Sequence, residues 1–204
     1  MPRITAPTVA EHRARRHTAL QAAARDILLA DGAQAVTPAS VGARAGLARS
    51  SVYKYYSSTG DILAQLAADV FADWTGRLRA ATDAAATDAA ATDAATDAAG
   101  GDGPAARIAA YVRGHLEFAR SDDRRVTDAI AAAGLPAECL DWVAAQQRAL
   151  VAPLREALAD RGDPDPEATA ALILGTLDGA ARLIDAGRDP AAVTDAALAF
   201  ITRP

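Results

Sequence analysis

The segment TPASVGARAGLARSSVYKYYSS, residues 37–58, contains two short helical signals separated by a turn signal. Thr37 can cap the first helix, and Pro38 suits its first position, because the amide proton that proline lacks would be unpaired there. Gly46 can adopt the positive φ that a sharp turn requires. A second helix then begins at residue 48 or 49 and is expected to run to Tyr55.

A helix, a glycine turn and a second helix with a polar, hydroxyl-rich face form the helix-turn-helix arrangement. Its second helix enters the DNA major groove with its N-terminal residues at the base edges. Arg49 is the only long donor at that tip, and arginine can pair with both acceptors of guanine. The other candidates are small hydroxyl side chains that permit close approach and longer donors suited to phosphates: Ser50, Ser51, Tyr53, Lys54 (the only lysine of the chain) and Tyr55.

Basic side chains are concentrated in the first quarter of an acidic chain. The 204 residues carry a formal net charge of -5. Residues 1–57 contain eight basic and three acidic side chains, giving +5, so the remainder carries -10. This distribution is expected where one end of a protein meets a polyanion, and scattered surface charge is the alternative.

Apolar residues recur at helical spacing through most of the chain and predict an all-α fold. Residues 17–31 form the helix before the motif, with Gly32 as its stop. The helix after the motif is expected to begin near Asp61, capped by Ser58 or Thr59. Further helices are predicted over 105–121, 124–133, 136–162, 166–187 and 189–203.

Residues 80–104, AATDAAATDAAATDAATDAAGGDGP, form a low-complexity tract of alanine, threonine and aspartate that ends in glycines and proline. Alanine favours helix, but the tract has no large apolar side chain whose burial would stabilise one. We therefore expect a fraying helix that passes into a mobile linker.

Residues 17–63 resemble the DNA-binding domain of the TetR family of bacterial repressors. The resemblance is carried by ARDILLADGAQAVT and by VGARAGLARSSVYKYYSS, which match the family's apolar-Ala pair, its Ala-Gly turn and its Tyr followed by an aromatic residue and Ser. It implies that Tyr56 packs inside the domain. The DNA-facing residues that we expect are Thr37, Arg44, Arg49, Ser50, Ser51, Tyr53, Lys54, Tyr55 and Thr59.

Three residues depart from the family pattern. Ala48 stands where a serine usually caps the recognition helix, and Gly42 stands where alanine is usual. Thr59 stands where a lysine usually touches a phosphate at the start of the fourth helix. Loss of that lysine should remove about one phosphate contact per half-site and weaken the salt dependence of DNA binding accordingly.

The resemblance also implies a division of the chain into three parts. Residues 1–16 would be a basic, flexible arm, 17–60 the helix-turn-helix DNA-binding domain, and 61–204 a larger helical domain that binds a ligand and dimerises, with 80–104 as an insertion. The implied partners are a double-stranded DNA operator, a small apolar or amphipathic effector and a second copy of the chain, and no membrane.

The second domain contains candidate residues for effector binding and for dimerisation. The effector candidates are Trp74, Tyr111, His115, Phe118 and Trp142, with Cys139 a sixth. Ordinary core packing is the alternative for each. The last two helices are apolar on two sides and so need two partners, one of which can be a second subunit. The dimer-interface candidates are Ala168, Leu172, Gly175, Gly179, Val193 and Phe200.

Other classes of protein receive little support from the sequence. His12, His17 and His115 have no neighbouring carboxylate or nucleophile at catalytic spacing, and no His/Cys cluster has zinc spacing, so we expect neither an enzyme nor a cofactor or metal site. No apolar run reaches the roughly 18 residues of a membrane span, so we expect a cytoplasmic protein. A helical adaptor that binds protein alone is the remaining rival.

Overall fold

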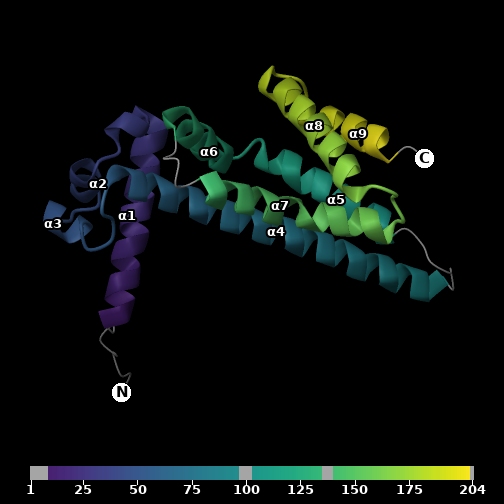
Figure 1. Cartoon of the computed structure of the whole chain (residues 1–204), viewed down its shortest axis with the longest axis horizontal. Helices are drawn as coiled ribbons and strands as arrows, with labels where there is room; N and C mark the ends of the chain where they lie inside the picture. Colours follow the sequence, from purple (N-terminus) through teal and green to yellow (C-terminus); the bar gives the residue numbers. More distant parts are fainter. Residues whose placement is uncertain (1–8, 97–102, 135–139, 203–204) are drawn as a thin grey trace. The chain divides into compact units, whose positions relative to one another are not determined.

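The computed structural model describes residues 9–96, 103–134 and 140–202, and every regular element in these ranges is a helix (Figure 1). The predicted all-α fold is confirmed. The chain forms two compact units. The first comprises Met1–Val70 and Arg125–Leu140, and the second comprises Phe71–Arg124 and Asp141–Pro204.

The first unit is built mainly from the helices of the N-terminal quarter. These are α1 (Val9–Asp31), the 3-10 helix η1 (Ala33–Ala35), α2 (Pro38–Arg44), α3 (Arg49–Val52), the start of α4 (Thr59–Thr96) and most of α6 (Asp122–Ala133). Its core contains the predicted apolar face of α1 and one buried residue from each end of the motif: Leu20, Ala23, Ala24, Ile27, Leu28, Val41 and Tyr56. This unit extends beyond the expected 17–60 range, because it includes the start of α4 and most of α6.

The helix α1 begins at Val9, eight residues before the predicted start at His17. The expectation of a flexible arm is therefore wrong for residues 9–16, while residues 1–8 lie outside the described part of the chain. Alanine, glutamate and arginine dominate this segment, and neither glycine nor proline interrupts it before Gly32. Good helix formers thus extend α1 without any apolar face in its first turns.

The caps of α2 and its turn are formed as predicted. The Thr37 side chain accepts a hydrogen bond from the Ser40 amide at 3.1 Å, and Ser40 Oγ accepts one from the Thr37 amide at 3.0 Å, which makes a reciprocal capping box. Pro38 occupies the first turn, and Gly46 has φ 68°. The start of α2 is thus fixed by side-chain hydrogen bonds, whereas the turn before α3 is fixed by the Gly46 conformation and by backbone hydrogen bonds such as the one from the Leu47 amide to the Gly42 carbonyl at 2.8 Å.

The recognition helix α3 is shorter than expected, because its α-helical span ends at Val52 rather than Tyr55. The next residues form tighter i to i+3 hydrogen bonds, from the Lys54 amide to the Ser51 carbonyl and from the Tyr55 amide to the Val52 carbonyl. Ala48 provides no side-chain cap at the other end. A helix this short depends on its packing rather than on its own hydrogen bonds.

The start of α4 is capped by two side-chain hydrogen bonds. Ser58 Oγ accepts from the Asp61 amide at 3.1 Å, and the Asp61 carboxylate accepts from the Ser57 amide at 2.8 Å. Helix formation thus begins at Thr59, two residues before the predicted start, with Ser58 as its cap.

The expected fraying of the Ala/Thr/Asp tract is wrong as far as Thr96, because α4 continues unbroken to that residue. Alanine has the highest helix propensity, and the hydroxyls of Thr87 and Thr92 donate to carbonyls one turn earlier in the same helix. Thr82 is fully buried, so part of the tract also contributes to the core. Residues 97–102 lie outside the described ranges.

The second unit contains the rest of α4, α5 (Gly103–Phe118), α7 (Leu140–Asp160), α8 (Pro166–Asp185) and α9 (Pro190–Ile201). Figure 1 shows α8 and α9 side by side. Gly114 lets α5 approach α4 closely, since a Cβ there would lie 2.7 Å from Leu78 Cδ2. The core is mainly aliphatic and includes Leu78, Ile108, Val112, Leu116, Leu154, Leu158, Ile173 and Leu177.

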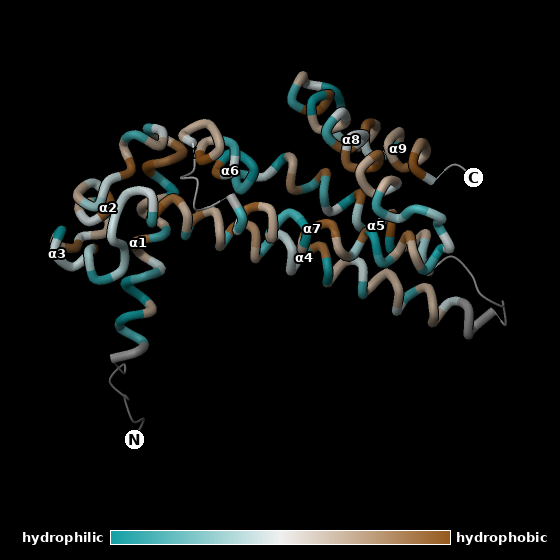
Figure 2. The backbone as a smooth tube through the Cα atoms, viewed as in Figure 1, coloured by the Kyte–Doolittle hydropathy of each residue, from teal (hydrophilic) through white to brown (hydrophobic). Residues whose placement is uncertain are grey.

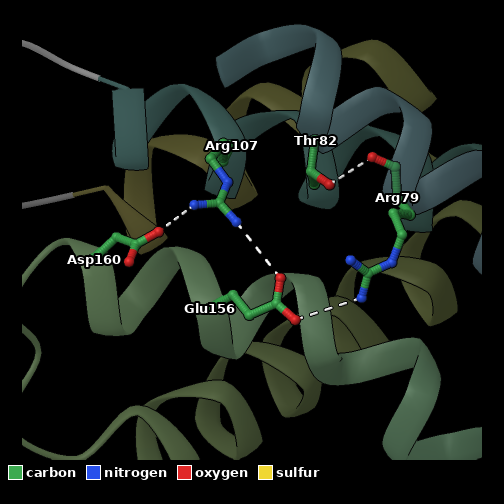
Figure 3. Close-up of polar contacts among 5 residues, drawn as sticks. All are labelled: Arg79, Thr82, Arg107, Glu156 and Asp160. Carbon is green, nitrogen blue, oxygen red and sulfur yellow. Dashed lines mark hydrogen bonds and ion pairs between the residues drawn. The ribbon is translucent and has the colours of Figure 1, made fainter. Parts of the chain in front are cut away.

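Arginine–carboxylate pairs connect three helices of this unit (Figure 3). Arg107 of α5 contacts both Glu156 and Asp160 of α7, and Arg79 of α4 contacts Glu156 at 3.4 Å. The Arg107 side chain is 15% exposed, whereas that of Arg79 is 47% exposed. Arg107 is therefore the more desolvated of the two cations.

Candidate nucleic-acid interface and internal ligand site

The outer face of α3 is polar and accessible. Arg49 and Ser50 are exposed, Ser51 is half-buried, and Tyr53 is 47% exposed. Val52 of the same short helix is fully buried and anchors it to the core. The buried face of α3 therefore packs against the core, while the predicted base-reading side chains lie on its exposed face.

The Arg49 side chain lies along its own helix. Its guanidinium donates to the Tyr53 hydroxyl, with Nη2 at 2.9 Å and Nε at 3.3 Å, and its Cζ lies 5.6 Å from the Tyr53 ring centroid. The two side chains thus form one exposed donor group at the start of the recognition helix.

The residues after α3 divide into an outward and an inward set. Lys54 is exposed and Tyr55 is half-buried. Tyr56 is buried, as the family resemblance implies, and burial together with the carboxylates of Asp69 and Asp61 raises its pKa to about 12. Tyr56 therefore stays neutral and acts as a packing residue.

The remaining DNA candidates occupy three different settings. Arg44 is exposed at the end of α2. Thr37 is half-buried and its hydroxyl is already used by the capping box, so its main role in this structure is to start α2. Thr59 is half-buried at the first turn of α4.

All five effector candidates lie in one aromatic group inside the second unit. The Trp74 and Phe118 rings stack with centroids 3.7 Å apart, and the His115 ring lies 5.1 Å from Trp74 and 5.9 Å from Tyr111. Phe71, which was not among the predicted effector residues, connects Trp142 of α7 to Trp74: its ring centroid lies 6.0 Å from that of Trp142 and 6.3 Å from that of Trp74. Cys139 lies outside the described residues.

Several polar atoms of this group are buried without a hydrogen-bond partner among the described residues. They are Trp74 Nε1, Tyr111 OH and His115 Nδ1, and Thr75 Oγ1 lies next to them in the chain. Buried polar groups are normally paired, since an unpaired one costs about 1–3 kcal/mol. Such a set inside an aromatic core is suited to an occupant that supplies the missing acceptors and donors.

Burial fixes the protonation states of the two titratable residues in this group. It lowers the pKa of His115 to about 4, opposed by the carboxylate of Asp178 and assisted by the charge of Arg124. It raises the pKa of Tyr111 well above its ordinary value. Both side chains are therefore neutral near pH 7, so the group offers hydrogen bonds rather than charge.

The predicted dimer residues are mostly at the surface of α8 and α9. Leu172 is 74% exposed and Phe200 is 64% exposed, while Val193 is buried. Ala168 and Gly175 are exposed and Gly179 is half-buried. An apolar hollow of about 450 Å³, lined in part by Gly179, Val193 and Phe200, opens between the helices.

The fold closely matches known protein structures. FadR from Bacillus subtilis, in complex with stearoyl-CoA, matches with TM-score 0.68 and 15% identity over 91% of this chain and 97% of that one. A TetR-family transcriptional regulator from Bordetella parapertussis 12822 matches with TM-score 0.62 and 20% identity over 92% and 94%. SmeT, in complex with triclosan, matches with TM-score 0.61 and 21% identity over 94% and 95%.

The chain has the fold of the TetR-type regulators. No protein-family model matches its sequence, and neither does any curated protein. The resemblance seen in residues 17–63 is thus confirmed at the level of the fold, and the similarity now extends over nearly the whole chain.

Within this TetR fold, two other kinds of site find no support in the described residues. No group of three or more histidine, cysteine, aspartate or glutamate side chains is placed to hold a metal ion there. No helix in the same ranges is long and apolar enough to cross a membrane.

The structure places three residues that the sequence analysis did not select beside two of the DNA-binding candidates. His12, Arg13 and Arg16 of α1 line a surface hollow together with Lys54 and Tyr55. The signal was present in the basic composition of residues 1–16, but a flexible arm has no defined position, so only the continuation of α1 brings these side chains to α3.

Proposed function

We propose that this chain is a transcriptional repressor that binds an inverted-repeat operator as a homodimer and is released by a small apolar or amphipathic molecule. The observation that carries the proposal is the exposed donor face of α3, where Arg49 and Ser50 project from a helix-turn-helix whose caps and turn are formed. The matched structures described as transcriptional regulators support the same function.

DNA reading follows from the chemistry of the exposed face. The Arg49 guanidinium can donate to O6 and N7 of one guanine, which discriminates against a wrong base by about 1–3 kcal/mol. Ser50 permits close approach, and Tyr53 and Lys54 provide donors to phosphates. A two-fold dimer would present two such faces to half-sites about 34–36 Å apart.

The aromatic group of the second unit is the proposed effector site. Its neutral, unpaired polar atoms and aromatic walls favour an uncharged or amphipathic molecule that carries hydrogen-bonding groups. If the effector prefers a conformation with a different separation of the recognition helices, it lowers operator affinity, and by reciprocity DNA lowers effector affinity. The complexes of FadR with stearoyl-CoA and of SmeT with triclosan make these two molecules suitable first probes.

The proposed dimer uses the exposed apolar side chains of α8 and α9. Leu172 and Phe200 are large apolar residues left in solvent by the single chain, and their burial by a second copy would remove that exposure. Light scattering of the purified protein tests this directly. A mass of one chain that stays unchanged at high concentration and on operator DNA would contradict the dimer.

The function as a whole is tested by selecting fragments of the source genome with the purified protein. The comparison variant is Arg49→Ala/Lys54→Ala, and the charge-matched control is Arg113→Ala/Arg120→Ala, which removes two exposed arginines of the second unit. We expect wild type and control to recover a short inverted repeat and the α3 variant to lose it. Equal recovery by all three, or none by any, would favour a helical adaptor instead.

Trp74 and Trp142, the only tryptophans of the chain, provide the readout for the effector. Stearoyl-CoA or triclosan that enters the aromatic group should change the intrinsic fluorescence and should release the recovered operator. A molecule that changes the fluorescence but leaves operator affinity unaltered would contradict effector-controlled release.

A further inference from the structure

A second basic site lies beside the recognition helix. A surface hollow of about 430 Å³ is lined, in the part of the chain that the structure describes, by His12, Arg13, Arg16, Lys54 and Tyr55. Three of these side chains are cationic and none is acidic. The hollow is thus formed between the first turns of α1 and the residues that follow α3.

Aromatic contacts hold the first turns of α1 in this position. Arg13 Cζ lies 5.9 Å from the Tyr55 ring centroid, and the His17 ring stacks against Tyr55 at 6.0 Å and against the buried Tyr56 at 5.8 Å. Tyr55 therefore connects the basic side of α1 to the end of the recognition helix. The cations of the hollow have a defined place, which a flexible arm would not give them.

The charges of this hollow are available to an external anion. Arg13, Arg16 and Lys54 are exposed, and the structure pairs none of them with a carboxylate among the described residues. Figure 2 shows the first half of α1 as a largely hydrophilic segment. Concentrated positive charge without internal neutralisation attracts phosphate groups.

We propose that the hollow binds backbone phosphates of the operator DNA, so that α3 is held at both ends: Arg49 reads a base at one end, and Arg13, Arg16 and Lys54 hold phosphates at the other. The inference rests on the proposed function. It also accounts for Thr59, where the family's usual phosphate-binding lysine is absent, because the lost contact would be replaced from α1.

The test is the salt dependence of binding to the inverted repeat that wild-type protein selects. Each phosphate contact contributes about -0.9 to the slope of log K against log salt. Arg13→Ala/Arg16→Ala should therefore reduce the magnitude of the slope by about 2 per half-site and weaken binding to all sequences alike. Arg13→Lys/Arg16→Lys should retain most of the slope, because a lysine still supplies a point charge.

Arg113→Ala/Arg120→Ala is the matched control, since it removes the same charge from exposed positions in the second unit. It should leave the slope unchanged. An unaltered slope for Arg13→Ala/Arg16→Ala on a folded protein, with the inverted repeat still selected, would overturn this inference and leave the proposed function standing. A slope lowered equally by the control would also overturn it, because net charge alone would explain the effect. Failure of wild type to select any repeat would overturn both.

Discussion

Arg49 and Tyr53 lie one helical turn apart and are joined by two hydrogen bonds. Arg49 Nη2, at 2.9 Å, and Nε, at 3.3 Å, both donate to the Tyr53 phenolic oxygen. The guanidinium is thereby restricted to one side of α3 before any DNA is present. Restricting a flexible side chain in advance lowers the entropy cost of ordering it on binding.

This pair predicts a graded effect of two substitutions on operator binding. Tyr53→Phe removes the shared acceptor but keeps the ring, and should weaken binding about 3- to 10-fold, in line with roughly 1 kcal/mol for one exposed hydrogen-bonding group. Arg49→Ala should cost more, about 1–3 kcal/mol, and should relax the preference for one base. Fluorescence anisotropy on single-base operator variants measures both. An equal loss for Tyr53→Phe and Arg49→Ala on every sequence would contradict the base-reading role.

Gly42 and Gly76 should respond in opposite directions to alanine. A Cβ at Gly42 would lie 2.9 Å from the Leu47 carbonyl oxygen and 2.9 Å from Val52 Cγ2, so α2 could not keep its approach to the turn and α3. Gly42→Ala should therefore destabilise the protein by about 1–3 kcal/mol, although alanine is usual there in the family. A Cβ at Gly76 would have no atom within 4 Å, so Gly76→Ala should stabilise α4 by up to about 1 kcal/mol. Thermal unfolding separates the two, and a stabilised Gly42→Ala protein would contradict the close packing.

Arg107 and Arg79 differ in how much their ion pairs should contribute. Arg107→Met should lower the free energy of unfolding by about 1–2 kcal/mol, because its side chain is mostly buried and contacts both Glu156 and Asp160. Arg79→Met should change it by less than about 0.5 kcal/mol, because that pair is exposed and screened. Denaturant unfolding at low and at high salt checks the difference. Equal losses would show that burial does not distinguish the two arginines.

His115 makes the stability of the second unit dependent on pH. Its pKa falls from the ordinary 6.5 to about 4 in the folded chain, so below pH 6.5 the unfolded state takes up a proton that the folded state refuses. The free energy of unfolding therefore decreases as the pH falls from 6.5 towards 4. The decrease due to this residue is about 2 kcal/mol between pH 7 and pH 5. His115→Gln should flatten this part of the unfolding profile. Parallel profiles for wild type and His115→Gln would contradict the buried neutral histidine.

Local signals explain why so much of the N-terminal fold could be predicted. Thr37, Pro38 and Gly46 act through their own backbone and nearest neighbours, so a cap, a first-turn proline and a left-handed turn can be recognised in the sequence alone. Tyr56 was placed inside by resemblance, and its burial is confirmed. The α-helical span of α3 was overestimated, because the tightened turn after Val52 depends on packing rather than on a sequence signal.

The two larger errors, in α1 and in the Ala/Thr/Asp tract, have a common origin. Both segments lack large apolar residues, so hydrophobic periodicity predicted that the first helix begins only at His17 and that the fourth helix frays beyond residue 80. Intrinsic propensity extends both helices without an apolar face. Contacts between distant segments could not be predicted for a different reason. The contact of Arg13 with Tyr55 and that of Phe71 with Trp142 join residues far apart in the chain, and helical periodicity does not show which helices pack together.

Lys54 carries the only lysine amine in the chain, and the structure exposes it beside the recognition helix. Acylation at lysine, whether by an amine-reactive label or by an acetyl group, would therefore be confined to the proposed DNA face. One modification would remove a positive charge from the hollow and insert a reporter at the same point. If operator DNA covers Lys54, it should protect this amine from acylation. Mass spectrometry of the labelled protein with and without operator DNA would then report the contact at a single residue.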